Sequence, residues 1–178
     1  MIKKIMKETF NNIINNKSFE KIGSWTVIQR KNFLNEVICS HDLMRLTFSY
    51  LTFIDCNFIN IDFRHTNFIS CSFTNCNFTD TLLFKSELEY CNFQNSKIFQ
   101  SYLSRVNFME SNFTNCEFDI VDMGGAVFTQ CEFIQPKFNK VRFLESVTLS
   151  KSKIWNSKKC IEVNTFDDVS KIIHNLED

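Results

Sequence analysis

The sequence predicts a solenoid, a fold in which short and similar units stack along one axis. From Leu46 to Glu145 the chain consists of twenty consecutive five-residue units that keep one register. A period of five fits neither an α-helix, which repeats every 3.6 residues, nor a plain strand, which repeats every two. A short fixed period is instead typical of stacked units that bury one continuous core.

Each unit has one large apolar residue at its centre and a small or medium residue two positions earlier. The centres are Phe48, Phe53, Phe58, Phe63, Phe68, Phe73, Phe78, Leu83, Leu88, Phe93, Ile98, Leu103, Phe108, Phe113, Phe118, Met123, Phe128, Phe133, Phe138 and Phe143. Two inward positions in five, one large and one small, describe a chain that wraps tightly around a narrow axis. The other three positions are mostly polar and are expected to point outward.

The repeats resemble those of the pentapeptide-repeat family. Units such as residues 56–60 (CNFIN) and 76–80 (CNFTD) match the pattern of that family closely. The resemblance implies an all-β solenoid, a right-handed quadrilateral β-helix with four units in each coil. The twenty units then make about five coils, and at about 4.8 Å per coil the column is roughly 24 Å long.

Coils of twenty residues place most of the cysteines in two inward columns. One column holds Cys56, Cys76, Ser96 and Cys116, and the other holds Cys71, Cys91, Ser111 and Cys131. The sequence has no Cys-x-x-Cys pair or matching histidine set for a metal. Parallel inward side chains also rarely meet the torsion angle of a disulfide. We therefore interpret these six thiols as core residues, which favours a reducing compartment.

The chain divides into an N-terminal segment 1–45, the repeats 46–145 and a C-terminal segment 146–178. Met1 to Asn16 has a helical apolar stripe with three lysines, which fits a membrane-surface helix or, as we favour, a helix that covers the open end of the first coil. Residues 18–45 keep the apolar phase, but Lys31, Glu36 and His41 occupy the small inward position. We expect a degenerate first coil or a cap there.

The C-terminal segment begins with a register slip of one residue, to Leu149 and Ile154, and ends in a predicted helix. Thr165 to Asp168 forms a capping box before an apolar face. That face consists of Phe166, Val169, Ile172, Ile173 and Leu176. In members of the family that end in a similar helix, the segment can build a homodimer, so the resemblance implies this option. A cap folded over the final coil fits the sequence equally.

Composition limits the classes of function. Twenty basic residues balance twenty acidic ones, so a neutral chain lacks the basic surface that direct nucleic-acid binding requires. No apolar run is long enough to span a membrane, and the N-terminus lacks the apolar core of a signal peptide. We expect a cytoplasmic protein that binds no membrane. No acid–base pair, phosphate loop or metal spacing indicates an enzyme, a cofactor or a metal.

The expected function is a rigid scaffold that binds a protein partner, with Phe84 and Phe99 as the outward residues to test first. The alternative is a modulator of type II topoisomerase, DNA gyrase, because the resemblance extends to quinolone-resistance proteins that imitate DNA in shape and charge. Such mimicry requires a strongly acidic column. Between Leu46 and Glu145 eleven acidic residues face seven basic ones, and no loop interrupts the repeats, so the scaffold is favoured.

Overall fold

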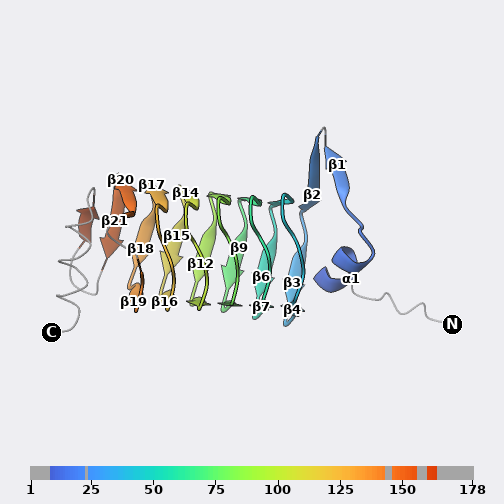
Figure 1. Cartoon of the computed structure of the whole chain (residues 1–178), viewed down its shortest axis with the longest axis horizontal. Coiled ribbons are helices and arrows are strands. Elements are labelled where there is room, and N and C mark those ends of the chain that lie inside the picture. Colours follow the sequence, from blue (N-terminus) through green and yellow to red (C-terminus); the bar gives the residue numbers. More distant parts are fainter. Residues whose placement is uncertain (1–8, 23, 143–145, 156–159, 164–178) are drawn as a thin grey trace.

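The computed structural model describes residues 9–22, 24–142, 146–155 and 160–163. They form an elongated column of stacked coils with one short helix, α1 (Phe10–Asn15), at its N-terminal end (Figure 1). Along each coil the chain runs over four faces, and three of these faces are β-sheets. The predicted four-sided solenoid is therefore confirmed.

The three sheets contain all the strands of the described residues. The first face consists of β1 (Glu20–Ile22), β2 (Trp25–Gln29), β5 (Thr47–Ser49), β8 (Asn67–Ile69), β11 (Glu87–Glu89), β14 (Asn107–Met109), β17 (Val127–Thr129) and β20 (Thr148–Ser150). The second consists of β3 (Asn32–Leu34), β6 (Thr52–Ile54), β9 (Ser72–Thr74), β12 (Asn92–Gln94), β15 (Asn112–Thr114), β18 (Glu132–Ile134), β21 (Ser152–Trp155) and β22 (Cys160–Val163). The third consists of β4 (Val37–Cys39), β7 (Asn57–Ile59), β10 (Asn77–Thr79), β13 (Lys97–Phe99), β16 (Glu117–Asp119) and β19 (Lys137–Asn139).

The fourth face has no strand among the described residues. Single parallel bridges join its coils through Asp42, Asp62, Leu82, Tyr102, Asp122 and Arg142. The chain then turns toward the next coil, and in the second coil the Thr66 amide donates to the Phe63 carbonyl at 3.2 Å. Because the chain leaves the ladder after one bridge, side chains in these turns are held by local contacts more than by strand pairing.

The register is the predicted one, and the column is one coil longer than expected. Phe58, Phe78 and Ile98 pair at intervals of twenty residues, and the described residues make about six turns. The additional coil is residues 27–46, whose strands β2, β3 and β4 pair in parallel with β5, β6 and β7. After residue 142 the partner spacing becomes twenty-one, since Phe128 pairs with Leu149, as the predicted slip requires.

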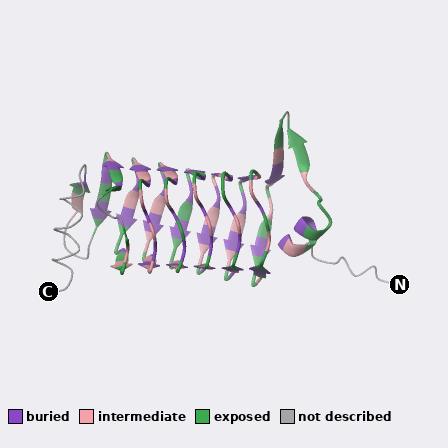
Figure 2. Ribbon diagram, viewed as in Figure 1, coloured by how far each residue is buried: buried purple, intermediate pink, exposed green. Residues whose placement is uncertain are grey.

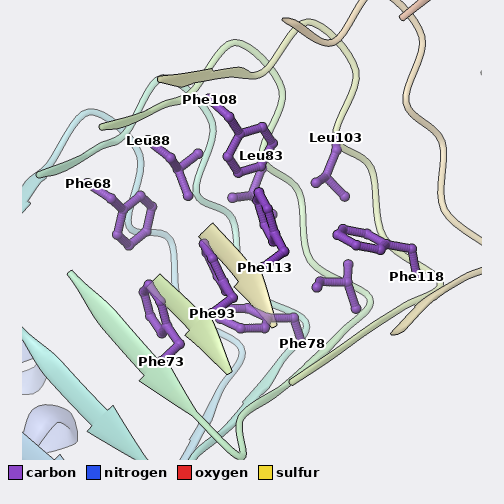
Figure 3. A pocket seen from close by; sticks show the side chains of 11 residues that line it. Phe68, Phe73, Phe78, Leu83, Leu88, Phe93, Leu103, Phe108, Phe113 and Phe118 are labelled. Carbon is purple, nitrogen blue, oxygen red and sulfur yellow. The ribbon is translucent and has the colours of Figure 1, made fainter. Parts of the chain in front are cut away.

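The strand centres are buried, and this pattern recurs from coil to coil along the column (Figure 2). The phenylalanine rings stack from coil to coil. The Phe93 ring centroid lies 4.8 Å from that of Phe73 and 5.0 Å from that of Phe113, with the rings nearly parallel. Where leucines such as Leu88 and Leu103 replace phenylalanine, a void of about 20 Å³ remains (Figure 3). Such an apolar void offers no polar partners to a ligand or a water.

Every corner of the coil is a residue in the left-handed region. Asn60 has φ 53°, His65 has φ 58° and Ile120 has φ 56°, and most of the other positions at the same place in their units share this conformation. Gly125 fills one such corner with φ 67°. Positive φ is uncommon for residues other than glycine, is tolerated best by Asn and Asp, and is unfavourable for a β-branched residue. Ile120 is therefore a strained corner.

The N-terminal end of the column is covered by α1, which lies within the segment that the sequence predicts to be helical. Phe10, Ile13 and Ile14 are buried, and the Phe10 ring lies 5.1 Å from the Phe33 ring. The Glu36 carboxylate accepts the Phe10 amide at 2.9 Å. Glu36 departs from the small-residue pattern because it faces the cap and not another coil. Residues 1–8 of the predicted helix lie outside the described residues.

Antiparallel hairpins extend the sheets at both ends. β1 pairs with β2 beyond the first coil and projects from the column, and β22 pairs with β21 at the other end (Figure 1). Val163 of β22 is fully buried. The predicted C-terminal helix, with Phe166, Val169, Ile172, Ile173 and Leu176, lies outside the described residues. Among those residues no helix is long and apolar enough to cross a membrane.

Candidate interaction surfaces

The inward polar groups bind the backbone of the coils. Cys116 Sγ donates to the Phe93 carbonyl at 3.4 Å, and Ser111 Oγ donates to the Leu88 carbonyl at 3.1 Å. Burial raises the pKa of the Cys116 and Cys131 thiols to about 11, so both stay protonated at neutral pH. All eight cysteines are free and six of them are buried, in the two predicted columns. The six buried thiols pack in the core of the column, and Cys56 differs from Cys116 and Cys131 because a hydrogen bond with Cys76 lowers its pKa to about 7.

The outward polar groups of the second and third faces also bind one another across coils. Asn75 Nδ2 donates to Asp55 Oδ1 at 2.9 Å, and Asn95 continues the ladder to Asn75. Asn77 donates to Asn57 at 2.9 Å on the third face. Much of the polar surface therefore supports the stack. Among the described residues no group of three or more His, Cys, Asp or Glu side chains is placed to hold a metal ion.

Carboxylates order the turns of the fourth face in three of its coils. Asp42, Asp62 and Asp122 each accept the backbone amide two residues later, at 3.0–3.1 Å. Such Asx turns stabilise a local bend in the chain. The hydrogen bond from the Arg64 guanidinium also lowers the pKa of the Asp62 carboxyl. These three acids are thus engaged in the turns of their own coils.

The two middle coils replace this aspartate with Leu82 and Tyr102. Next to them lie Phe84, Lys85 and Arg105, and we call these five residues the face-four patch. Lys85 Nζ lies 5.3 Å from the Phe84 ring centroid, and Arg105 Cζ lies 5.7 Å from it. Tyr102 is 47% exposed, whereas Phe84 is half-buried. The patch combines two aromatic rings with two cations and contains no carboxylate.

Phe99, the second outward aromatic that the sequence singles out, lies on a different face from Phe84. It ends β13 on the third face, where Lys97 Nζ lies 5.2 Å from its ring centroid. Lys97 in turn pairs with Glu117 at 2.9 Å and with Asp119 at 3.4 Å. Phe99 is half-buried within this ion-pair cluster. The structure therefore places the two predicted residues in separate environments.

A groove that the repeat pattern does not predict lies at the N-terminal end. It encloses about 220 Å³ between the β1–β2 hairpin and the outside of the first face. Its lining is Ile22, Trp25, Val27, Gln29, Thr47, Ser49, Asn67 and Ile69. Trp25 is 53% exposed, and Thr47 Oγ1 is buried without a hydrogen-bond partner in the described part of the chain. The groove depends on an antiparallel hairpin outside the repeat, so the five-residue period carries no signal for it.

The face-four patch, by contrast, has a signal in the sequence that a five-residue period does not reveal. At intervals of twenty residues the positions 42, 62 and 122 hold aspartate, whereas 82 and 102 hold Leu82 and Tyr102. The residue three positions later is Arg45, Lys85 or Arg105 in three of these coils. The departure from aspartate is visible only when positions twenty residues apart are compared, because a period of five does not distinguish the four faces.

Comparison with known proteins agrees with this geometry. The family described as pentapeptide repeats matches the chain with eight copies, at residues 48–83 and 91–130. The chain thus contains pentapeptide repeats over these residues, as the sequence predicts. No curated protein matches the sequence.

Several solved structures of pentapeptide-repeat proteins resemble the fold. Rfr23 from the cyanobacterium Cyanothece 51142 is 9% identical, with 70% of this chain and 91% of that chain covered and a TM-score of 0.39. A trypsin-treated form of QnrB1, a plasmid-mediated fluoroquinolone resistance protein, is 15% identical, with 85% and 98% covered and a TM-score of 0.29. HetL from Nostoc sp. strain PCC 7120, involved in heterocyst differentiation regulation, is 8% identical, with 82% and 97% covered and a TM-score of 0.29.

Proposed function

We propose that this pentapeptide-repeat protein is a rigid, non-catalytic scaffold that binds a protein partner through outward side chains of its column. The observation that carries the proposal is the exposure of large aromatic residues on a regular lattice. Tyr50, Tyr90 and Tyr102 are 56%, 48% and 47% exposed, each at a fixed place in its coil. Tyrosine is enriched in protein interfaces because it offers a large apolar ring with a polar end.

Rigidity supports binding because an ordered surface loses little conformational freedom when a partner docks. Each coil is tied to the next by parallel backbone hydrogen bonds on three faces, such as those between Asn77 and Cys56 and between Lys97 and Cys76. The asparagine ladders reinforce this pairing. The outward side chains thus keep nearly fixed spacings along the column.

The non-catalytic part of the proposal rests on how the reactive side chains are used. The buried thiols and hydroxyls donate to backbone carbonyls of the preceding coil, as Cys131 does to Phe108 at 3.5 Å. Burial raises the pKa of Cys91, Cys116 and Cys131, which opposes formation of a thiolate nucleophile. A hydrogen bond with Cys76 lowers the pKa of Cys56 to about 7, but the Cys56 side chain is fully buried in the column. A binding role uses only the outside of the column and leaves these groups in their structural contacts.

The second candidate function is modulation of a type II topoisomerase by DNA mimicry. It is favoured by an uneven distribution of charge. Between residues 47 and 140 the first three faces carry eight acidic residues against Lys97, Lys137 and Lys140. Two of these acids, Glu117 and Asp119, are paired with Lys97. The remaining carboxylates are dispersed over three faces, which is why the scaffold is the first proposal.

Affinity capture from a lysate of the source organism tests both functions. The baits are the intact chain, the Phe84→Asp/Phe99→Asp variant and a Gln94→Asp/Gln130→Asp control that adds the same charge at other outward positions. We expect one protein to be captured by the intact chain and the control and lost with the phenylalanine variant. Capture of no protein, or equal capture by all three baits, would contradict the scaffold. Enrichment of gyrase subunits would favour the second function, which a supercoiling assay then checks.

A further inference from the structure

We infer that the face-four patch docks an acidic α-helix of the partner protein. This inference rests on the proposed function, because it names the chemistry of the partner that the scaffold binds. It starts from a row of basic side chains on the corner between the fourth and first faces. Arg45, His65, Lys85 and Arg105 occupy equivalent corners of four successive coils, and all four are exposed.

The cations at the centre of this row have no carboxylate partner within the described residues. Lys85 and Arg105 contact the Phe84 ring, and no ion pair of either is formed with residues 24–142. Arg64, one position before the row, is already paired with Asp62 at 2.6 Å. The centre of the row is therefore a locally positive surface that complements an anionic partner.

The nearest acids of the fourth face do not neutralise this surface. Asp62 and Asp122 lie one coil below and one coil above Leu82 and Tyr102, where their carboxylates hold the turns of their own coils. Ser104 Oγ also donates to Asp122 at 2.7 Å. These acids lie at the two ends of the patch and repel the carboxylates of a docked partner there. They therefore limit the length of the acidic partner surface that fits the patch.

The spacing of the row matches the turns of an α-helix laid along the column. Neighbouring coils lie about 4.8 Å apart, as strands in a sheet do. One turn of an α-helix rises about 5.4 Å, and side chains three or four residues apart share one face. Over the two intervals from His65 to Arg105 the mismatch is about 1.2 Å, which flexible Lys and Arg side chains absorb. A helix with a Glu or Asp at each turn can thus place successive acids beside Lys85 and Arg105.

Apolar side chains of the patch are expected to add binding energy to the charge attraction between the patch and the docked helix. The Phe84 ring contacts both cations, and the Tyr102 backbone is bridged to that of Leu82 on the neighbouring coil. Aromatic and arginine side chains carry much of the energy of protein interfaces. The docked helix is therefore expected to place one apolar residue between its acids, over Phe84.

Nucleic acid fits the patch less well than an acidic helix does. Phosphate contacts gain affinity from many unpaired cations along a long surface. Here the cationic row is one residue wide, and Glu87 and Glu89 stand on the adjoining first face, next to Lys85 along the chain. These carboxylates would face the second strand of a duplex or the flanking phosphates of a single strand.

The test is a titration of the full chain with a defined probe. The probe is a fluorescein-labelled, alanine-based helical peptide with Glu at positions 4, 8, 11 and 15 and Leu at position 7. Fluorescence anisotropy at low and high salt gives its Kd. Control ligands are a peptide of the same charge with two prolines, which cannot form a helix, and a short DNA duplex. Lys85→Glu/Arg105→Glu is compared with Lys137→Glu/Lys140→Glu, which changes the net charge equally on another face.

We expect the Kd of the helical peptide for the Lys85→Glu/Arg105→Glu variant to be more than tenfold higher than for the intact chain. Its Kd for the control variant should stay within twofold of that for the intact chain. Salt should weaken the intact interaction. Equal binding of the proline peptide, equal losses in both variants, or tighter binding of the duplex would overturn the inference. Circular dichroism and thermal unfolding show that each variant is folded. If the peptide fails while capture of a protein still depends on Phe84 and Phe99, the helix inference fails and the scaffold stands.

Discussion

Inside the column, Phe73, Phe93 and Phe113 repeat one stacked geometry at intervals of twenty residues, with ring centroids 4.8–5.0 Å apart. On the outside of the fourth face, Asp62 and Tyr102 occupy equivalent positions with different chemistry, an acid that orders a turn and an exposed ring. The interior tolerates little variation because each ring contacts the rings above and below. The fourth face is joined by single bridges, so its side chains can vary without changing the stack.

This difference separates two kinds of information in the sequence. The repeated residues determine the register and most of the stability, and the departures from the repeat mark surfaces available for recognition. Departures at the ends have a different cause. Glu36 accepts the Phe10 amide of α1, and His41 contacts Asn11 at 3.2 Å, so both serve the cap. The comparison between interior and fourth face therefore applies to the middle coils.

The largest expected effect is the loss of one interior ring. Phe93→Ala removes stacking on both neighbouring coils and leaves a cavity, so we expect the free energy of unfolding to fall by about 3–5 kcal/mol. Urea unfolding monitored by circular dichroism measures the change. Gln94→Ala, one residue further and exposed, should change it by less than about 0.5 kcal/mol. Similar losses in the two variants would contradict the distinction between interior and surface.

A smaller effect is expected at the corners. Ile120 has φ 56°, a conformation that Asn60 adopts at the same position three coils earlier with φ 53°. Ile120→Asn should raise the free energy of unfolding by about 1 kcal/mol, and Asn60→Ile should lower it by about the same amount, because a β-branched residue is strained in the left-handed region. Thermal unfolding measures the change in the free energy of unfolding for both variants. Changes of the same sign would show that packing, and not backbone strain, dominates at these corners.

The smallest interior effect is expected at the small inward positions. Cys116→Ser keeps a donor of nearly the same size, and Ser96 already occupies the adjacent position of this column, where it donates to Phe73 and Gln94. We expect the free energy of unfolding to fall by less than about 1.5 kcal/mol. Denaturant unfolding measures this change, with Cys116→Leu as a control that overpacks the same position. A loss as large as that of Phe93→Ala would contradict the view that this position needs only a small donor.

The sequence predicts the repeating part of this protein at the level of single residues. The strict five-residue period identifies the buried centres, and the resemblance to a known family supplies the twenty-residue coil that stacks Cys56 on Cys76. The first coil is less visible because Lys31, Glu36 and His41 break the pattern, and two of them, Glu36 and His41, contact the cap. The groove beside Trp25 depends on the pairing of β1 with β2, a non-local contact that no repeat encodes.

The interaction surface is predicted only in part. Phe84 is half-buried on the fourth face, and its role in binding stays a prediction. Its environment depends on the turn geometry of that face, which a period of five does not describe. Phe99 is outward as expected and lies in an ion-pair cluster on another face. The helix formed by Phe166, Val169, Ile172, Ile173 and Leu176, and the homodimer it would build, stay predictions because these residues lie outside the described part of the chain.

The most direct test of the account restores the repeat on the fourth face. Leu82→Asp/Tyr102→Asp places in the middle coils the residue that positions 42, 62 and 122 already have, where each aspartate accepts an amide two residues later. Urea unfolding and partner capture are measured on the same preparation. We expect unchanged or slightly higher stability together with loss of the captured partner. A large loss of stability with capture intact would contradict the account, because it would show that Leu82 and Tyr102 belong to the fold and not to a recognition surface.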